Sequence, residues 1–280
     1  MLDNITPIIL TLNEAPNIGR TLEQLRWAQD IVVMDSYSDD DTLSIVEQFP
    51  QARIFQRKFD SLENQWNYAL RETGIGTDWV LALDADYILT DELYNEISSL
   101  RPAAETAGYR VNFDYCIYGR ALRGSAYPPV TVIYRRDKAH YRQDGHAHRV
   151  IVEGPVKQLV GRMLHDDWKP LSSWLRSQDS YMQLELHKLL SKDKSGLRLP
   201  DRIRKLRFVA PFFMLAFCLF AKRGILDGRP GLYYALQRML AETLLSLYLI
   251  NDDMTRDLAK QTDSKIPNAH TVMSGRGSDA

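Results

Sequence analysis

The sequence predicts an α/β protein whose N-terminal half alternates short strands with helices and whose C-terminal third is helical. Three observations support this prediction. Apolar runs typical of buried strands alternate with helical patterns over residues 6–86. Polar clusters stand directly after three of those runs. After residue 107 the pattern changes to antiparallel strand signals, and helical periodicity resumes near residue 171.

The first 86 residues are expected to form strands and helices in alternation. The predicted strands are 7–12, 31–34, 53–55 and 79–84. The predicted helices are 17–27, a segment capped by residues 38–41, and 62–72. Helices of this length between strands are typical of parallel βαβ units, whose ligands bind beyond the carboxyl ends of the strands.

Residues 107–170 are expected to complete the sheet. Residues 109–113 and 130–134 predict antiparallel strands joined by a loop rich in glycine and proline. Further short strands are predicted at 149–153 and 157–165. A helix is then expected over 171–190.

The fourth predicted strand ends on two carboxylates, Asp84 and Asp86. Residues two apart on a strand point to the same side, so both side chains face one space. Desolvating two like charges is costly unless a cation lies between them. A divalent metal that holds a phosphate explains the pair, and a solvated turn is the alternative.

Two more polar clusters are expected on the same edge of the sheet. Asn13 and Glu14 follow the first strand, and Asp35 and Ser36 follow the second. Each cluster alone fits an ordinary helix cap. Three clusters on one edge of a parallel sheet favour a shared ligand site.

The bulk composition narrows the class of protein. The 280-residue chain has a formal net charge of −1, which argues against a general nucleic-acid binder. Cys116 and Cys218 suggest neither a disulfide framework nor a zinc site, so a reducing compartment fits. The N-terminus shows no signal-peptide pattern. Neither a Gly-x-Gly-x-x-Gly sequence after the first strand nor a Walker loop is present, which disfavours dinucleotide and ATP enzymes.

The apolar run 208–221 is the main feature of the C-terminal third. Its 14 residues are fewer than the roughly 20 that span a bilayer as a helix. Basic residues flank it on both sides, which favours shallow insertion at a membrane surface over the alternative of a core helix. The apolar segment 232–250 is expected to pack against it, and residues 262–280 are expected to be a disordered tail.

Four ordered motifs carry a resemblance to a known family. They are ILTLNE (9–14), VVMDSYSDDDT (32–42), ENQWNYAL (63–70) and WVLALDAD (79–86). The sequence resembles the family 2 glycosyltransferases with the GT-A fold, and within them the branch that includes the lipopolysaccharide core β-1,4-glucosyltransferase. The match is dense over residues 6–100, and the turn GILDGRPG (224–231) is similar to one in the C-terminal part of that branch.

The resemblance implies a domain organisation and a fold. Residues 1–168 are expected to form a GT-A domain with a Rossmann-like mixed sheet flanked by helices. Residues 169–261 are expected to form a helical, membrane-associating region, followed by the tail 262–280.

The resemblance also implies site residues. Asp86 would bind Mg²⁺ or Mn²⁺ that bridges the two phosphates of the donor, and His165 would complete the metal or phosphate site. The remaining positions are expected to bind the nucleotide-sugar, most simply a UDP-sugar. These positions are Leu12, Asn13, Glu14, Asp35, Asn64, Asn67, Asp84 and Arg135. For Asn64 and Asn67 a structural role is equally expected and a merely solvated helix face is the alternative, and Arg135 also fits a solvated strand end.

The catalytic base is expected near residue 148, where related enzymes carry a His-Glu pair. This chain departs from that pattern because Arg149 follows the histidine. The candidates are therefore Asp144, His146 and His148, with Glu153 ranked below them. A histidine with an ordinary pKa of about 6.5 can accept a proton at neutral pH. These histidines could instead only bind phosphate or cap a loop.

The function implied by the resemblance is inverting transfer of a sugar to a hydroxyl of a lipid-linked glycan or lipopolysaccharide core. One alternative is a polyprenyl-phosphate sugar synthase, whose phosphate acceptor needs no base. Another is a non-catalytic GT-A scaffold in a membrane complex, against which the retention of Asp84 and Asp86 argues. The expected location is the cytoplasmic face of the inner membrane, as a peripheral or monotopic protein.

Overall fold

The computed structural model describes residues 1–144, 147–191 and 199–264. Within these ranges a mixed sheet runs in the order β3-β2-β1-β4-β8-β6-β11-β5, with β7 paired to β6, and a hairpin of β9 and β10 lies beside it. The strands are β1 (Ile5–Thr11), β2 (Ile31–Asp35), β3 (Ala52–Gln56), β4 (Trp79–Asp84), β5 (Tyr87–Leu89), β6 (Gly108–Ile117), β7 (Arg120–Ala121), β8 (Val130–Arg135), β9 (Ala139–Asp144), β10 (Ala147–Val152) and β11 (Val156–His165).

Three helices connect the parallel strands β1 to β4, as predicted: α1 (Ile18–Glu23), α2 (Thr42–Val46) and α3 (Leu62–Glu72). Helix α4 (Asp91–Ser99) follows β5 and was not predicted. Helix α3 begins where Ser61 accepts a hydrogen bond from the backbone N–H of Asn64. Its buried face presents Trp66, Ala69 and Leu70 to the sheet. The predicted α/β class is confirmed.

Both faces of the central sheet are covered, which explains the continuous apolar strands of the sequence. In β1, Ile9 belongs to the core on one face and Ile8 to the core on the other. Strand β1 pairs in parallel with β2 and with β4. The carboxyl ends of these three strands therefore meet at one edge.

The later strands make the sheet mixed, because some of them run antiparallel to their neighbours. Strand β8 runs antiparallel to β4 and β6, which confirms the predicted antiparallel strands. Strand β11 pairs in parallel with β6 and antiparallel with the short β5. This register places His165, the last residue of β11, opposite both Tyr87 and Tyr115.

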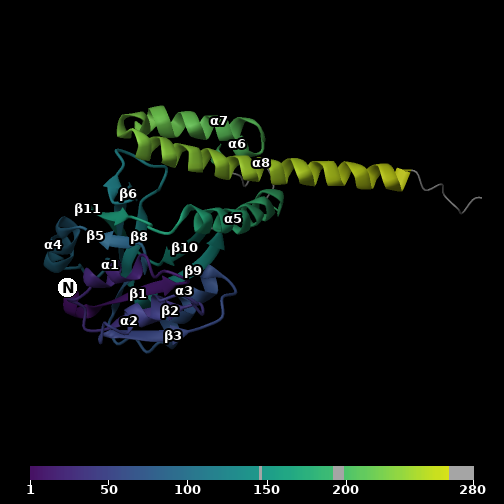
Figure 1. The fold of residues 1–280 in the computed structure, drawn as a ribbon. Helices are drawn as coiled ribbons and strands as arrows, with labels where there is room; N and C mark the ends of the chain where they lie inside the picture. The colour runs from purple at the N-terminus through teal and green to yellow at the C-terminus, as the bar shows by residue number, and fades with distance from the viewer. Residues whose placement is uncertain (145–146, 192–198, 265–280) are drawn as a thin grey trace, which may run out of the picture.

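The C-terminal third forms a helical layer beside the sheet (Figure 1). Helix α7 packs along the first part of α8, and the second part of α8 runs well beyond the other elements (Figure 1). Helix α5 also packs on α8, through Met182 and Leu189 against Leu245 and Leu249. The helices are α5 (Leu171–Ser191), α6 (Leu199–Arg204), α7 (Val209–Ala216) and α8 (Arg229–Ser264), with a π-helical turn over Phe217–Ala221.

An ion cluster fixes α6 to the rest of this layer. The Arg204 guanidinium contacts Glu242 of α8 at 2.7 Å and Glu185 of α5 at 3.5 Å. Both carboxylates are buried, so the guanidinium supplies the charge that their burial requires.

Helix α8 continues to Ser264, past the predicted start of the tail at residue 262, and residues 265–280 lie outside the described ranges. In the part of the chain that the structure describes, no helix has both the length and the apolar character needed to cross a bilayer.

Candidate active site

The loops after β1 and β2 are locked to each other at the carboxyl edge of the sheet. Asn13 adopts the left-handed conformation, with φ of 55°. Its side-chain oxygen accepts the backbone N–H of Asp39, and its own N–H donates to Ser38 Oγ, both at 2.9 Å. Leu12 beside it is half exposed. This pairing holds Leu12 and Asn13 at the edge predicted to bind the nucleotide.

Asp35 is fully buried at the end of β2, and its carboxylate accepts several internal hydrogen bonds. Oδ1 accepts the hydroxyls of Thr11 and Ser38, at 3.0 and 2.5 Å. Oδ2 accepts the backbone N–H of Ser38 at 2.9 Å and the Gln56 side chain at 3.2 Å. The structure thus gives Asp35 a clear role in shaping the loop after β2.

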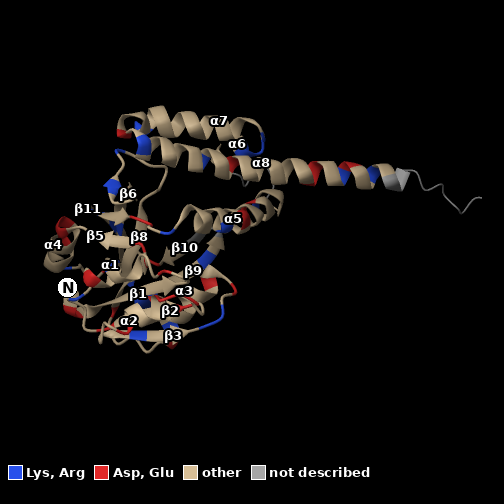
Figure 2. Ribbon diagram, viewed as in Figure 1, with Lys and Arg blue, Asp and Glu red and all other residues tan. Residues whose placement is uncertain are grey.

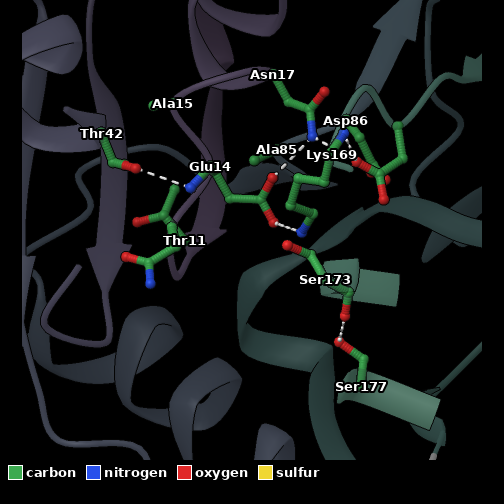
Figure 3. A network of polar contacts seen from close by, with 12 residues as sticks. Thr11, Glu14, Ala15, Asn17, Thr42, Ala85, Asp86, Lys169, Ser173 and Ser177 are labelled. Carbon is green, nitrogen blue, oxygen red and sulfur yellow. Dashed lines mark hydrogen bonds and ion pairs between the residues drawn. The ribbon is translucent and has the colours of Figure 1, made fainter. Parts of the chain in front are cut away.

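Glu14 lies at the centre of a polar network that joins the first loop to residues after β11 (Figure 3). Its carboxylate accepts Lys169 Nζ at 2.6 Å and Asn17 Nδ2 at 2.9 Å. Burial raises the pKa of Glu14 to about 7, although the charge of Lys169 opposes that rise. The Glu14 and Asp167 carboxylates raise the pKa of Lys169 against the effect of its own burial. The ammonium group is therefore fixed beside the carboxylates of this edge.

Asp86 and His165 form the second centre of the site. His165 Nε2 lies 2.9 Å from Asp86 Oδ2, and both side chains are largely buried. Burial alone would raise the pKa of Asp86, but the charge and hydrogen bond of His165 lower it. Asp86 in turn raises the pKa of His165, against the effect of burial on the imidazole.

Three tyrosines enclose the imidazole of His165. The ring centroids of Tyr115, Tyr127 and Tyr87 lie 4.7, 4.8 and 5.3 Å from it. The Tyr87 and Tyr127 hydroxyls also contact each other at 2.5 Å. The cage fixes the ring plane, so the imidazole is preorganised toward Asp86.

The residues present fit a divalent cation in part. Among the described residues, Asp86 Oδ1 and His165 Nδ1 are buried without a hydrogen-bond partner. A carboxylate oxygen of this kind is a ligand that Mg²⁺ and Mn²⁺ prefer. No set of three or more His, Cys, Asp or Glu side chains in the described ranges is arranged to hold a metal. The protein thus offers an incomplete ligand set that a diphosphate and water could complete.

Asp84, the other half of the predicted pair, ends β4 beside Leu10 of β1. It is partly buried, and its field raises the pKa values of Tyr87 and Tyr127, after the larger effect of burial. Asp84, Asp86 and His165 therefore lie at the carboxyl edge of the sheet.

Arg135 is not brought to this edge, so its predicted role in donor binding is corrected. Strand β8 is antiparallel to β4, and Arg135 pairs with Trp79 at the start of β4. Five residues of strand separate Trp79 from Asp84, which corresponds to about 17 Å. The guanidinium instead lies over the Trp79 ring at 4.9 Å and donates to the Thr106 carbonyl.

The two asparagines of α3 have separate structural partners. Asn67 accepts the backbone N–H of Tyr141 and donates to its carbonyl, at 2.8 and 3.1 Å, and so fixes α3 to β9. Asn64 is exposed and donates to Asp60 at 3.1 Å. These contacts favour the structural alternative for both residues.

Two of the candidate bases, Asp144 and His148, belong to the β9–β10 hairpin. Strand β9 ends at Asp144, and His148 pairs with Gln143 in β10. His146 lies outside the described residues, as do the side chains of Asp144 and His148. The hairpin is held against α3, where Gln143 donates its N–H to Glu63 at 2.9 Å.

Sequence reasoning missed the segment after β11. Asp166 is buried, pairs with Arg20 at 2.8 Å and accepts the indole N–H of Trp168. Asp167 accepts Asn17 Nδ2 at 2.8 Å. The charged run 165–169 was the available signal, but only the register of β11 shows that it faces Asp86.

A narrow cleft opens next to this segment. Its walls come from the end of β6, the start of α5 and α8, and include Tyr118, Asp167, Lys169, Trp174 and Tyr233. Tyr118 is exposed and has a φ of 48°, a costly conformation for a bulky residue. The cleft places aromatic rings beside the carboxylates and the ammonium group of the site.

This chain belongs to glycosyl transferase family 2, whose model matches residues 6–150. The membership and the mixed, helix-flanked sheet agree with the predicted family and GT-A fold.

Proteins with similar sequences match different fractions of this chain. The lipopolysaccharide core biosynthesis glycosyltransferase LpsC of Rhizobium meliloti is 27% identical over 79% of this chain and 82% of its own length. An uncharacterized glycosyltransferase of Rickettsia felis is 35% identical over 34% of this chain, which spans only 33% of that relative. The first of these agrees with the predicted lipopolysaccharide core branch.

Solved structures with a similar arrangement are more distant in sequence. The mannosyltransferase PcManGT of Pyrobaculum calidifontis, solved with GDP-Man and Mn²⁺, is 15% identical over 88% of this chain and 87% of its own, with a TM-score of 0.48. Staphylococcus aureus TarS, solved with UDP-GlcNAc, is 14% identical over 91% of this chain and 92% of its own, with a TM-score of 0.45. These values are too low to bear on the function of this chain.

Proposed function

We propose that this protein catalyses inverting transfer of a sugar from a nucleoside-diphosphate sugar, with a UDP-sugar favoured, to a hydroxyl of a lipid-linked glycan or lipopolysaccharide core. The observation that carries the proposal is the Asp86–His165 pair, which leaves one buried carboxylate oxygen without a partner at the carboxyl edge of parallel strands. Ligands of open α/β sheets bind at that edge. Family membership supports the reaction class.

Asp86 and His165 are the residues that would hold Mg²⁺ or Mn²⁺ together with the donor. When bound, such a cation offsets the charge that develops on the departing diphosphate. His165 is oriented for this by its three tyrosines, and Asp86 by a backbone contact, since its carbonyl accepts the N–H of Asp166 at 3.0 Å. Lys169 places one further positive charge beside Glu14, and that charge would stabilise a departing diphosphate bound next to it.

The loops after β1 and β2 are the proposed nucleotide side of the site. They are cross-linked through Asn13, Ser38 and Asp39, and anchored by the hydrogen bonds of Asp35. A loop fixed in this way presents backbone groups to a ligand without losing freedom on binding. The same rigidity keeps the half-exposed Leu12 at the rim.

Transfer to a hydroxyl requires a group that accepts its proton as the bond to the anomeric carbon forms. Asp144, His146 and His148 are the proposed candidates for that group. Replacing His148 with alanine should lower turnover more than it lowers donor affinity. Full turnover in that variant would remove His148 from the candidates.

The acceptor class rests on the similarity to LpsC, a lipopolysaccharide core biosynthesis enzyme. An ionised lipid phosphate would need no base, so a polyprenyl-phosphate sugar synthase is the competing reaction. Mild acid cleaves a sugar phosphate ester and releases the transferred sugar as a free monosaccharide, whereas a glycosidic bond to a glycan hydroxyl survives and keeps the sugar on the glycan. Release of the transferred sugar as a free monosaccharide would replace the proposed acceptor.

Calorimetric titration with UDP and Mn²⁺ tests the donor site. Wild-type protein should bind, and Asp86→Asn should bind at least tenfold more weakly. Asp137→Asn is the matched control, because Asp137 is exposed and follows β8 near the opposite edge of the sheet. Equal UDP affinity in the Asp86 variant would refute the assignment. A thermal-shift panel of UDP-, GDP- and dTDP-sugars with Mn²⁺ would identify the nucleobase of the donor.

A further inference from the structure

The exposed face of α7 carries large aromatic side chains. Phe212 and Phe213 are 65% and 49% exposed, and Phe208 just before the helix is 71% exposed. The opposite face packs inward through Ala210, Pro211, Met214 and Leu215. A helix with one face in water normally has polar residues on that face, whereas α7 is apolar on both faces.

The exposed apolar surface continues past both ends of α7. Leu206 precedes it at 59% exposure, and Phe220 of the π-helical turn follows at 67%. Ile225 and Leu226 extend it with exposures of 56% and 59%. We call these residues, with Phe208, Phe212 and Phe213, the α7 face. Soluble monomers rarely show so many large apolar side chains together on one surface, and a surface of this kind is typical of an interaction site.

The charge of the same segment is entirely positive. Between residues 202 and 226 the sequence holds six lysines and arginines and no aspartate or glutamate. Arg204 and Arg207 are neutralised from α8, by Glu242 and by Asp253 at 2.7 and 2.6 Å. Lys222 and Arg223 follow the apolar turn, and α7 itself carries no charge (Figure 2).

We propose that the α7 face docks on an anionic phospholipid bilayer, with α7 lying in the plane of the membrane. Phenylalanine and leucine side chains enter the boundary between headgroups and acyl chains, and the cations at the ends contact lipid phosphates. The 13 residues Val209–Ala221 extend about 20 Å as a helix, which is too short to cross the roughly 30 Å hydrocarbon core. The helix therefore binds along the surface.

A second copy of the chain is the competing occupant of the α7 face. Two copies facing each other through this segment would bring cations against cations, because it holds no acidic residue. An anionic lipid surface supplies the missing negative charge. The positive charge therefore favours an anionic bilayer over a second copy of the chain as the occupant of the α7 face.

Vesicle flotation of the full-length protein tests the proposal. We expect binding to vesicles of phosphatidylcholine with about 30% of the anionic lipid phosphatidylglycerol, and weaker binding to phosphatidylcholine alone. Phe212→Ser combined with Phe213→Ser should lower the partition coefficient at least tenfold. Val160→Ser is the matched control, since Val160 is 88% exposed but lies in β11.

A second pair of variants tests the cations separately. Lys222→Gln with Arg223→Gln should lower binding to the anionic vesicles several-fold and leave binding to phosphatidylcholine unchanged. UDP affinity should stay at the wild-type value in all these variants, so a failure of the lipid proposal is distinct from a failure of the proposed reaction. Unchanged partitioning of the double Phe variant would overturn the proposal. So would a Phe variant that only converts a dimer to a monomer.

Discussion

His165 Nε2 and Asp86 Oδ2 lie 2.9 Å apart although 79 residues separate them in the sequence. The contact depends on β11, which carries His165 to the end of β5 and β6, and on β4, which delivers Asp86 to the same edge. Two elements that are unrelated in sequence therefore form one candidate ligand set.

Replacement of His165 tests whether this pair serves a ligand. His165→Gln should weaken Mn²⁺-dependent UDP binding by roughly 10- to 100-fold, which is typical for the loss of a metal-site partner. His187→Gln is the control, because His187 is exposed on α5. If titrations without Mn²⁺ show the same loss, His165 acts on the nucleotide rather than on a cation.

Removal of Lys169 should destabilise the protein because Glu14 would stay buried without its ion-pair partner. We expect Lys169→Met to lower the free energy of unfolding by about 1–3 kcal/mol, below the range for a fully buried pair because Lys169 is one-quarter exposed. Lys169→Arg should restore most of this loss in urea titrations.

The pH dependence of the unfolding free energy of Lys169→Met gives a second measurement of the same ion pair. Burial raises the pKa of Glu14 to about 7 in the folded protein, above its value of 4.5 in the unfolded chain. The folded state thus binds the proton more tightly, and its stability falls as pH rises from 4.5 toward 7. The Met variant should go on losing stability above pH 7, because without the charge of Lys169 the pKa of Glu14 rises further. A loss that ends at the same pH in both proteins would contradict the assigned ion pair.

Asn67 and Asn64 should behave differently although they lie one helical turn apart. Asn67→Ala removes two hydrogen bonds to the Tyr141 backbone and should cost about 1–3 kcal/mol. Asn64→Ala removes an exposed contact to Asp60 and should cost less than about 1 kcal/mol. Thermal unfolding measures both, and UDP titration should give wild-type affinity for each. A loss of UDP affinity in either variant would return that residue to the donor site.

Arg135→Ala tests whether Arg135 has a structural role and takes no part in donor binding. Its guanidinium lies over Trp79 and donates to Thr106 at the opposite edge from Asp84. We expect a loss of about 1–2 kcal/mol in unfolding free energy. Donor affinity measured in the same preparation should change less than twofold, and a tenfold drop would place Arg135 back in the site.

The sequence predicts the strands and helices that have a strong local signal. Helix 62–72 and strand 79–84 are found with the predicted bounds, since a serine cap and a continuous apolar run mark them. Strand β5 has only three residues and helix α4 follows it at once, so neither element was predicted from the sequence.

The site is predicted where one strand and its following loop determine it. Asp84 and Asp86 follow from β4 alone, whereas the position of Arg135 depends on the direction of β8. Lys169 was missed because its distance from Glu14 is set by the pairing of β11 with β5 and β6, which is non-local. Strand direction and register thus mark the limit of reasoning from local pattern.

The irregularity in β11 between Gln158 and Arg162 has a consequence for how this chain tolerates insertions and deletions. One residue added or removed between that irregularity and His165 turns the imidazole to the opposite face of the sheet. Gly161 adds to this constraint, since a methyl group there would lie 2.6 Å from the Leu93 backbone. Length variation among homologues should therefore collect in the loop between β7 and β8 and avoid the ten residues of β11.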